Sequence, residues 1–476
     1  MNRVSVFNYP TGSCISFAEK PSSTHAADPH RIRETDEVSV SRPFDLAYAA
    51  ATARTAQMPE FRPAEAPAAR ALAPANAGAC RRDCETCAPS RNGLHRVCVA
   101  DSLDGLDALK EAWETLEREA AAPLTPFQSF AFCRAMAETM LKAHPDYRLH
   151  VICVRRAADD APLLILPMEI ETHAGVRVAR WLAGPAVQYG DVIAAGLPDD
   201  DALKAAIDSA GIGGRADVFD FRNIRQDAAI APFLARTGHA TGVTSEAPFV
   251  DLTRGTELDA VLAPQPAKRK KDRRRKWRRI AERGDTRFEV VGPGPRAAAL
   301  MRQALAFKLD WLEANGLVSR ALSRKWVRDG LVAVAATAPA TRLSVLSVDD
   351  DVAAIEVGFV EGRRYHAFMG AINAAHGEVS PGELQTEETL SWCLDGGMER
   401  YDFLPPVQRY KLGWAAQTET VANYALSRSW RGWLYARLYL GFAEPRMKEA
   451  FHRLPAPARQ LLARLFGQAA TESAAR

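Results

Sequence analysis

At 476 residues the chain is too long for a single ordinary domain, and its length predicts two or three. The apolar share of 47% and the charged share of 25% are typical of a globular protein, and a formal charge of only +3 excludes a global field that would favour an acidic partner. No uncharged apolar run of about 18 residues occurs, which excludes a membrane-spanning helix. The first twenty residues also lack the apolar core of a secretory signal, so we expect a cytoplasmic protein.

Residues 1–92 mix Ala, Pro, Ser, Thr and charges without a sustained period of two or 3.6, which predicts a disordered arm. Within this arm Cys80, Cys84 and Cys87 have the C-x3-C-x2-C spacing of a radical-enzyme iron–sulfur cluster, and Cys98 could complete a four-thiolate zinc site. The barrel that should follow such a cluster is not visible in the pattern. We therefore expect no metal, with metal binding by these cysteines as the open alternative.

Residues 93–250 are predicted to form an α+β domain. A strand-like segment is followed by two helices with apolar residues at helical spacing, the second announced by Thr125-Pro126. A meander of strands runs from about 147 to 184, and helix, strand and helix follow. Helices laid against a mostly antiparallel meander indicate the α+β class.

Residues 251–299 form a linker that contains ten basic residues in the twelve of Lys268–Arg279. Such a cluster could neutralise the phosphates of a nucleic acid or of anionic lipid. The alternative is a solvated helix whose buried face is marked by Trp277 and Ile280 and which ends at Gly284.

Residues 300–428 repeat the order of the first domain: two helices, a meander, a helix opened by Ser380-Pro381-Gly382, and a short strand that ends at Asp402. The sequence therefore predicts two tandem copies of one unit. Residues 429–476 are predicted to be an amphipathic helical tail, which either makes peripheral contact with a membrane or packs on the last domain.

At this point the chain resembles the GNAT-superfamily acetyltransferases of the CelD-like type, which are associated with cellulose and exopolysaccharide biosynthesis and have tandem GNAT-like halves related to the FemABX aminoacyl transferases. The resemblance covers about Leu94 to Ala425. The segments that carry it are Thr125-Pro126-Phe127-Gln128-Ser129, Gly184-Pro185 with Tyr189-Gly190-Asp191, the basic helix 268–283, Ser380-Pro381-Gly382, Tyr401-Asp402-Phe403-Leu404 and Tyr410-Lys411-Leu412-Gly413-Trp414.

The resemblance implies acetyl-coenzyme A, or another acyl-coenzyme A, as the co-substrate. It also implies a catalytic C-terminal domain and an acceptor such as a polysaccharide precursor or an amino sugar. The basic helix then becomes a family feature, so we do not expect nucleic acid as a partner.

Ser380, Pro381 and Gly382 are the predicted coenzyme-binding residues. Proline presets the turn, glycine lets a ligand approach the backbone, and the N–H groups of the next helical turn face an anion. A plain helix cap is the alternative, because the chain lacks the glycine-richer Q/R-x-x-G-x-G/A loop of ordinary GNAT enzymes.

Glu356, Asp402, Tyr410 and Lys411 are the predicted catalytic residues. Alternation along the strand places Glu356 on the face opposite Ile355 and Val357, where it could act as the base. Lys411 could neutralise a phosphate or an oxyanion and Tyr410 could donate to the leaving thiolate, while a structural Asp402–Lys411 ion pair is the competing interpretation.

These residues predict an acyl-coenzyme A-dependent N- or O-acyltransferase. A FemABX-like aminoacyl transferase that uses aminoacyl-tRNA remains an alternative, as does a non-catalytic accessory protein of polysaccharide synthesis. The sequence does not identify the acceptor, the acyl group or the oligomeric state.

Overall fold

The computed structural model describes residues 87–90, 92–120, 124–143, 147–211 and 216–455. Most of the predicted N-terminal arm, with Cys80 and Cys84, lies outside these ranges, and so does the end of the tail. Within these ranges no helix has the length and apolar character that crossing a membrane requires.

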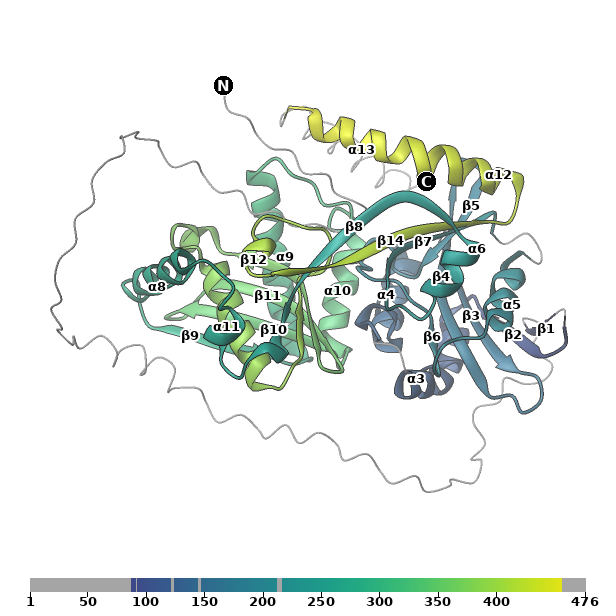
Figure 1. Cartoon of the computed structure of the whole chain (residues 1–476), viewed down its shortest axis with the longest axis horizontal. Helices are drawn as coiled ribbons and strands as arrows, with labels where there is room; N and C mark the ends of the chain where they lie inside the picture. The colour runs from purple at the N-terminus through teal and green to yellow at the C-terminus, as the bar shows by residue number, and fades with distance from the viewer. Residues whose placement is uncertain (1–86, 91, 121–123, 144–146, 212–215, 456–476) are drawn as a thin grey trace, which may run out of the picture. The chain divides into compact units, whose positions relative to one another are not determined.

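The N-terminal half begins with two strands, three helices and a meander (Figure 1). Its elements are β1 (Cys87–Pro89), β2 (His95–Ala100), α2 (Leu103–Ala108), α3 (Lys110–Glu119), a 3-10 turn (Pro126–Gln128), α4 (Phe130–Ala143), β3 (Arg148–Arg156), β4 (Pro162–His173), β5 (Val176–Trp181), β6 (Ile193–Ala194), α5 (Asp200–Gly211), β7 (Val218–Arg225), α6 (Ala231–Thr237) and β8 (His239–Asp251).

The C-terminal half follows with the same kinds of element. They are a 3-10 turn (Leu252–Arg254), α7 (Leu258–Val261), α8 (Ala267–Ala281), β9 (Thr286–Val291), α9 (Pro295–Ala314), α10 (Lys325–Thr337), β10 (Thr341–Val348), β11 (Asp351–Glu361), β12 (Arg364–Ile372), a 3-10 segment (Ala374–Val379), α11 (Pro381–Asp395), β13 (Arg400–Asp402), a 3-10 turn (Lys411–Gly413) and β14 (Gln417–Ser427). The tail is α12 (Trp430–Leu434), a π-helix (Tyr435–Ala443) and α13 (Glu444–Arg453).

The two halves repeat one topology. Each has a strand, a helical layer, a three-stranded antiparallel meander, a helix, and a strand parallel to the third strand of the meander. In the N-terminal half that parallel pair is β5 with β7, and in the C-terminal half it is β12 with β13. The structure therefore confirms two tandem GNAT-like units of the α+β class.

All the described strands belong to one sheet, which runs through both halves (Figure 1). The strand order is β1-β2-β3-β4-β5-β7-β14-β8-β13-β12-β11-β10-β9, with β6 paired to β4. β14, the last strand in the chain, lies between β7 and β8, and the far end of β8 pairs with β13. The domain boundaries drawn from the sequence stay a prediction, since the sheet continues across them.

One apolar core also extends across both halves. Phe127 and Phe132, which come before and within α4, contact Phe359 of β11 edge-to-face at ring-centroid distances of 5.8 and 6.0 Å. All three side chains are buried, and α4 packs against α10. Because aromatic side chains contribute large buried areas, these contacts fix how the halves meet.

Candidate functional site

In the C-terminal half β12 separates from β13 after a short parallel pairing. Only three residue pairs form, and His366 with Asp402 is the last. The register between β11 and β12 then shifts by one residue next to Val357 and Gly358, which makes Phe368 an extra residue on β12. A bulge bends its strand, and among the described strands β12 has no partner on this side as far as Ile372. We call this gap in the backbone pairing the C-terminal cleft, a name that refers to the strand pairing alone.

Lys308 reaches the separated part of β12 from α9. It is 1% exposed, its Nζ donates to the carbonyl oxygen of Gly370 at 3.2 Å, and it lies 4.5 Å from the ring centroid of Trp311. The sequence analysis did not select it. A signal was present, because Lys308 occupies a position in the apolar stripe of α9 together with Met301 and Leu305.

The turn that follows β13 carries two of the predicted catalytic residues. The buried Lys411 donates from Nζ to the carbonyl oxygens of Leu404 at 2.7 Å and Pro406 at 3.1 Å. The half-buried Tyr410 packs its ring edge-to-face on Phe403 at 6.3 Å. The structure thus places Lys411 and Tyr410 on the turn that Asp402 begins, with Lys411 tying the two ends of that turn together.

Asp402 lies at the junction of the two halves. Its Oδ1 accepts hydrogen bonds from the Tyr189 hydroxyl at 2.9 Å and from the Leu404 N–H at 2.8 Å, and its Oδ2 lies 3.0 Å from Arg400. Complete burial opposes ionisation, but Arg400, His366 and these two donors together hold the pKa of Asp402 below its usual value. Asp402 is therefore ionised at neutral pH.

His366 lies beside Asp402 and is fully buried. Its ring is 6.5 Å from that of Phe127 and 6.2 Å from that of Tyr189, and neither ring nitrogen has a hydrogen-bond partner among the described residues. Burial lowers the pKa of His366 to about 3, so the imidazole is neutral at physiological pH. His366 is thus a core histidine without a hydrogen-bond partner among the described residues.

Glu356 lies on β11 under α11. It is 6% exposed, and its Oε1 accepts hydrogen bonds from the hydroxyls of Tyr401 at 2.7 Å and Tyr365 at 3.1 Å. Burial raises the pKa of Glu356 to about 7, against the opposing effect of the two hydrogen bonds. A carboxyl group with this pKa can both accept and return a proton near neutral pH.

Glu356 and Asp402 lie on opposite faces of the sheet. Tyr401, which contacts Glu356, directly precedes Asp402 on β13, and successive side chains of a strand point to opposite faces. The structure thus separates Asp402 from Glu356, whereas Tyr410 packs in one cluster with Phe403, Tyr401 and Tyr365, and the last two donate to Glu356.

The predicted coenzyme-binding residues begin α11. Ser380 has φ +55° and makes no side-chain cap, Pro381 is the first helical residue, and Gly382 lies in the first turn. Pro381 has no N–H and the Glu383 N–H donates to the carbonyl oxygen of Ser380 at 3.1 Å, so the Gly382 N–H is the first-turn donor that can face a ligand. Glu383 in the same turn is neutralised by Lys276 of α8 at 2.6 Å.

α8 lies against α11 through an unexpected basic residue. Arg273 is buried and donates to Glu387 at 3.0 Å, while the indole of Trp277 donates to the same carboxylate at 2.9 Å. The predicted buried face with Trp277 and Ile280 is confirmed, and Arg273 joins it. Six other basic residues of α8 are exposed and form no ion pair with a described residue: Lys268, Arg269, Lys271, Arg274, Arg278 and Arg279.

A pocket of about 270 Å³ opens beside the start of α8. Its walls come from the end of β8, the segment that joins α7 to α8, and the residues from Leu412 to Gln417. Arg254 and Arg269 supply positive charge, and Arg254 pairs with Asp251 of the same pocket at 3.3 Å. The pocket therefore lies between the basic start of α8 and the residues of β8 that pair with β13.

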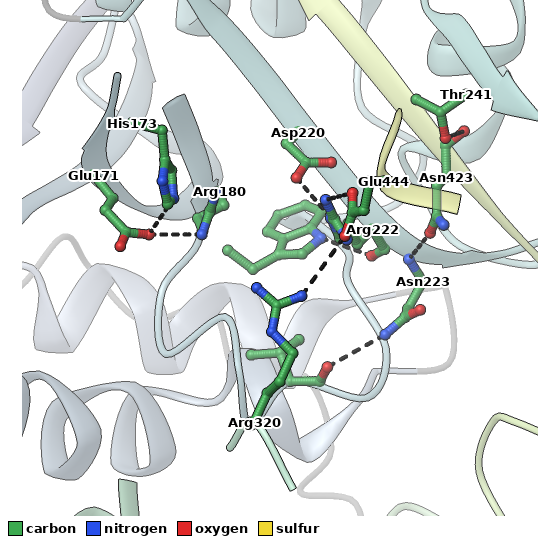
Figure 2. Close-up of polar contacts among 12 residues, drawn as sticks. Glu171, His173, Arg180, Asp220, Arg222, Asn223, Thr241, Arg320, Asn423 and Glu444 are labelled. Carbon is green, nitrogen blue, oxygen red and sulfur yellow. Dashed lines mark hydrogen bonds and ion pairs between the residues drawn. The ribbon is translucent and has the colours of Figure 1, made fainter. Parts of the chain in front are cut away.

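The corresponding separation in the N-terminal half is bridged by side chains. β5 and β7 also pair for three residues, ending with Arg180 and Asp220. Beyond that point the Trp181 indole donates to the carbonyl oxygen of Arg222 at 2.9 Å, and a Cβ at Gly190 would lie 1.9 Å from the same indole. Figure 2 shows the ion pairs of Asp220, Arg222 and Glu444 around this point. Side chains thus bridge β5 and β7 beyond their last residue pair.

The described residues contain no group of three or more His, Cys, Asp or Glu side chains that could hold a metal ion. Cys98 is disulfide-bonded, so it offers no thiolate to a four-cysteine zinc site. Cys133, Cys153 and Cys393 are buried.

Comparisons with solved structures give distant likenesses. A crystal structure of FemX has a TM-score of 0.47 at 10% identity and covers 69% of this chain and 98% of its own. The C-terminal domain of a putative lysylphosphatidylglycerol synthetase from Agrobacterium fabrum has 0.44 at 13%, with 70% and 95% covered, and a tandem GNAT protein from the clavulanic acid biosynthesis pathway has 0.37 at 13%, with 70% and 99% covered. These scores are below 0.5, so no function is transferred from them.

The family comparison covers the C-terminal half. No curated protein matches the sequence at a significant level. Residues 267–412 match the model described as an acetyltransferase (GNAT) domain, a segment that runs from the first residue of α8 to the turn after β13 and contains the C-terminal cleft. Residues 267–412 are therefore identified as a GNAT-type acyltransferase domain.

Proposed function

We propose that the C-terminal half transfers an acyl group from an acyl-coenzyme A, such as acetyl-coenzyme A, to an amine or hydroxyl group of a saccharide acceptor. The observation that carries the proposal is the separation of β12 from β13 close to the start of α11, within the domain matched by the GNAT model. The edge of β12 can pair with the amide groups of an extended carrier arm. The Gly382 N–H and the N-terminal end of α11 can face its pyrophosphate.

Proton transfer is assigned to Glu356. The acceptor amine attacks the thioester carbonyl carbon, the C–S bond breaks, and Glu356 takes the proton that the amine loses. The leaving thiolate is protonated by Tyr410 or by water, which completes the transfer. The pKa of Glu356, raised to about 7 by burial, supports this role because a general base works best near the operating pH.

Asp402 and Lys411 shape the cleft in this proposal. Asp402 ties the cleft to Tyr189 of the other half, and Lys411 closes the turn through Leu404 and Pro406. The acceptor class, a polysaccharide precursor or amino sugar of cellulose or exopolysaccharide synthesis, rests on the sequence resemblance.

Calorimetric titration with acetyl-coenzyme A tests the carrier. We expect the full chain to bind it and Gly382→Trp to lower the affinity at least about tenfold, because an indole in the first turn of α11 would cover the N-terminal end of the helix. Asp201→Trp is the matched control, since Asp201 is the second residue of α5, the N-terminal counterpart of α11. Absence of binding by the wild-type protein would rule out coenzyme A as the carrier.

A second candidate is an aminoacyl transferase that takes its acyl group from aminoacyl-tRNA. The observation in its favour is the set of exposed basic residues on α8, which lie beside the pocket at Arg269. A polyanion that contacts several of these residues would bind with strong salt dependence.

Charge reversal separates the two candidates. Lys268, Lys271, Arg274 and Arg278 are changed together to Glu, which leaves Arg273 and Trp277 in place to hold α8. Under the coenzyme proposal, acetyl-coenzyme A affinity stays within about threefold of wild type. The control variant has Lys110, Arg118, Lys142 and Arg156 changed to Glu. If the wild-type protein and this control bind tRNA but the α8 variant does not, the aminoacyl function is favoured instead.

A further inference from the structure

The tail after β14 has an inner face that is fully occupied. Gly432, Ala436, Leu440 and Glu444 recur every four residues and are all buried. The apolar members pack on Val178, Val218 and Ala425, and a Cβ at Gly432 would lie 1.8 Å from the carbonyl oxygen of Asp217. The tail thus packs on β14, which lies within the predicted last domain, and also on β5 and β7 of the N-terminal half.

Polar contacts hold the same face. Arg222 donates to both carboxylate oxygens of Glu444, at 3.0 and 2.8 Å, and also to Asp220 at 2.6 Å (Figure 2). Ser429 caps α12 and donates to Asp217 at 2.8 Å. The His173 ring stacks on Tyr435 with centroids 6.5 Å apart. The orientation of the tail about its own axis is thus fixed by contacts at both ends.

The outer face is apolar and exposed. Trp430, Leu434, Leu438 and Phe442 also recur every four residues, offset by two from the buried row, and are 70%, 37%, 60% and 55% exposed. A π-helix has more residues per turn than the about 3.6 of an α-helix, so side chains four residues apart lie in a row nearly parallel to the helix axis. Two residues are then about half a turn, so the exposed row lies opposite the buried row.

Trp433 and Met447 extend this row, at 53% and 60% exposure. The outer face therefore holds six of the ten large apolar side chains that are exposed in the described residues; the other four, Leu94, Leu197, Val318 and Leu412, are scattered. A contiguous exposed row of this kind on a fixed helix marks an interaction surface.

The charges around the row are positive. Arg431, Arg437 and Arg446 are exposed and have no ion pair with a described residue, and Arg446 lies 3.6 Å from the ring centroid of Phe442. Of the acidic residues in this segment, Glu444 is buried and Glu449 is paired with Arg453. Tryptophan, leucine and phenylalanine bordered by arginine match a membrane interface that carries anionic lipid.

We propose that the outer face of residues 430–447 docks on the surface of an anionic membrane, with its aromatic and aliphatic side chains in the headgroup layer and its arginines against the lipid phosphates. The tail lies along the surface and does not cross it. The proposal is independent of the carrier used by the C-terminal cleft.

Co-sedimentation of the full chain with vesicles tests the proposal. We expect binding to vesicles of phosphatidylcholine mixed with phosphatidylglycerol and weaker binding to phosphatidylcholine alone. Trp433→Asp with Leu438→Asp should lower the partition coefficient at least about tenfold, because two apolar side chains that would enter the headgroup layer are lost. Arg437→Glu with Arg446→Glu should remove the preference for phosphatidylglycerol.

Leu197→Asp is the matched control, because Leu197 is an isolated apolar side chain that is 76% exposed; its partition coefficient should equal that of the wild type. Thermal unfolding of the double aspartate variant should match the wild type, since the outer row is not part of the core. Wild-type protein that stays in the supernatant, or equal binding by the aspartate variant, overturns the proposal. A wild-type dimer that becomes monomeric in the aspartate variant, with no vesicle binding by either, would make this face a contact between two copies and also overturn it.

Discussion

The two halves share one topology but differ where their parallel strands separate. In the N-terminal half Trp181 bridges β5 to β7 and the Arg222 ion pairs with Asp220 and Glu444 surround the same point. In the C-terminal half β12 has an extra residue at Phe368, and Lys308 of α9 donates to the Gly370 carbonyl oxygen. The comparison teaches that one topology can bridge its separating parallel strands with side chains in one half and leave the edge of β12 without a strand partner in the other.

Removal of the Trp181 side chain, which bridges β5 and β7, is expected to have the largest effect on stability. Trp181→Ala should lower the free energy of unfolding by about 3–5 kcal/mol, because a buried indole and its hydrogen bond are removed. Urea denaturation measures this change. Trp430→Ala, which removes an indole that is 70% exposed, should change the same quantity by less than about 0.5 kcal/mol. Similar values for the two variants would contradict the description of Trp181 as a bridge between β5 and β7.

Removal of the proposed general base tests whether catalysis takes place in the C-terminal half. Glu356→Gln should lower the turnover number about 100-fold or more, because proton transfer from the acceptor is lost. Release of coenzyme A from acetyl-coenzyme A, with glucosamine as acceptor, measures the rate. Glu169→Gln is the control from the other half, since burial also raises the pKa of Glu169, to about 8. A rate loss in the Glu169 variant and none in the Glu356 variant would reverse the assignment of the two halves.

The contact between Glu444 and Arg222 distinguishes a structural from a catalytic N-terminal half. Glu444→Gln should lower the free energy of unfolding by about 2 kcal/mol, because two hydrogen bonds between charged groups are weakened while Arg222 keeps Asp220. Chemical denaturation gives the value. Turnover per folded molecule should be unchanged, and a change in turnover at constant stability would argue against a purely structural role.

The smallest effects concern pH. The native pKa of Glu356 is about 7, above its ordinary value of 4.5, so between these values the native state binds more protons and the unfolding free energy falls as pH rises. Across this pH interval the unfolding free energy of Glu356→Gln should fall by on the order of 2 kcal/mol less than that of the wild type. Asp402 has a lowered pKa, so its contribution is present above pH 3.8 and is lost as pH falls. Denaturation midpoints at several pH values test both signs, and Asp402→Asn should change stability only above that range.

Much of the fold follows from local patterns. Proline after Ser380 predicted the start of α11, strand alternation predicted that Glu356 and Val357 occupy opposite faces, and helical spacing predicted the buried side of α8 at Ile280. The repeat of element order predicted two tandem units. These features depend on neighbouring residues, which the sequence displays directly.

The candidate site was less predictable because its contacts join distant positions. Asp402 is 213 residues from Tyr189, and no local pattern relates the two. Lys308 and Arg273 break the rule that charged residues of amphipathic helices face solvent, so a search for charges within apolar stripes would have found Lys308. The roles predicted for Tyr410, Lys411 and Ser380 remain untested. The bridging of β5 and β7 by Trp181 could not be read from a topology that both halves share.

The position of β14 has a consequence for how the protein is made. Translation of the N-terminal half ends near Asp251, but the strand that lies between β7 and β8 is not synthesised until residue 427. Until then β7 and β8 expose unpaired edges, which other nascent chains can join. The two halves should therefore fold as a single late cooperative step and express poorly as separate fragments.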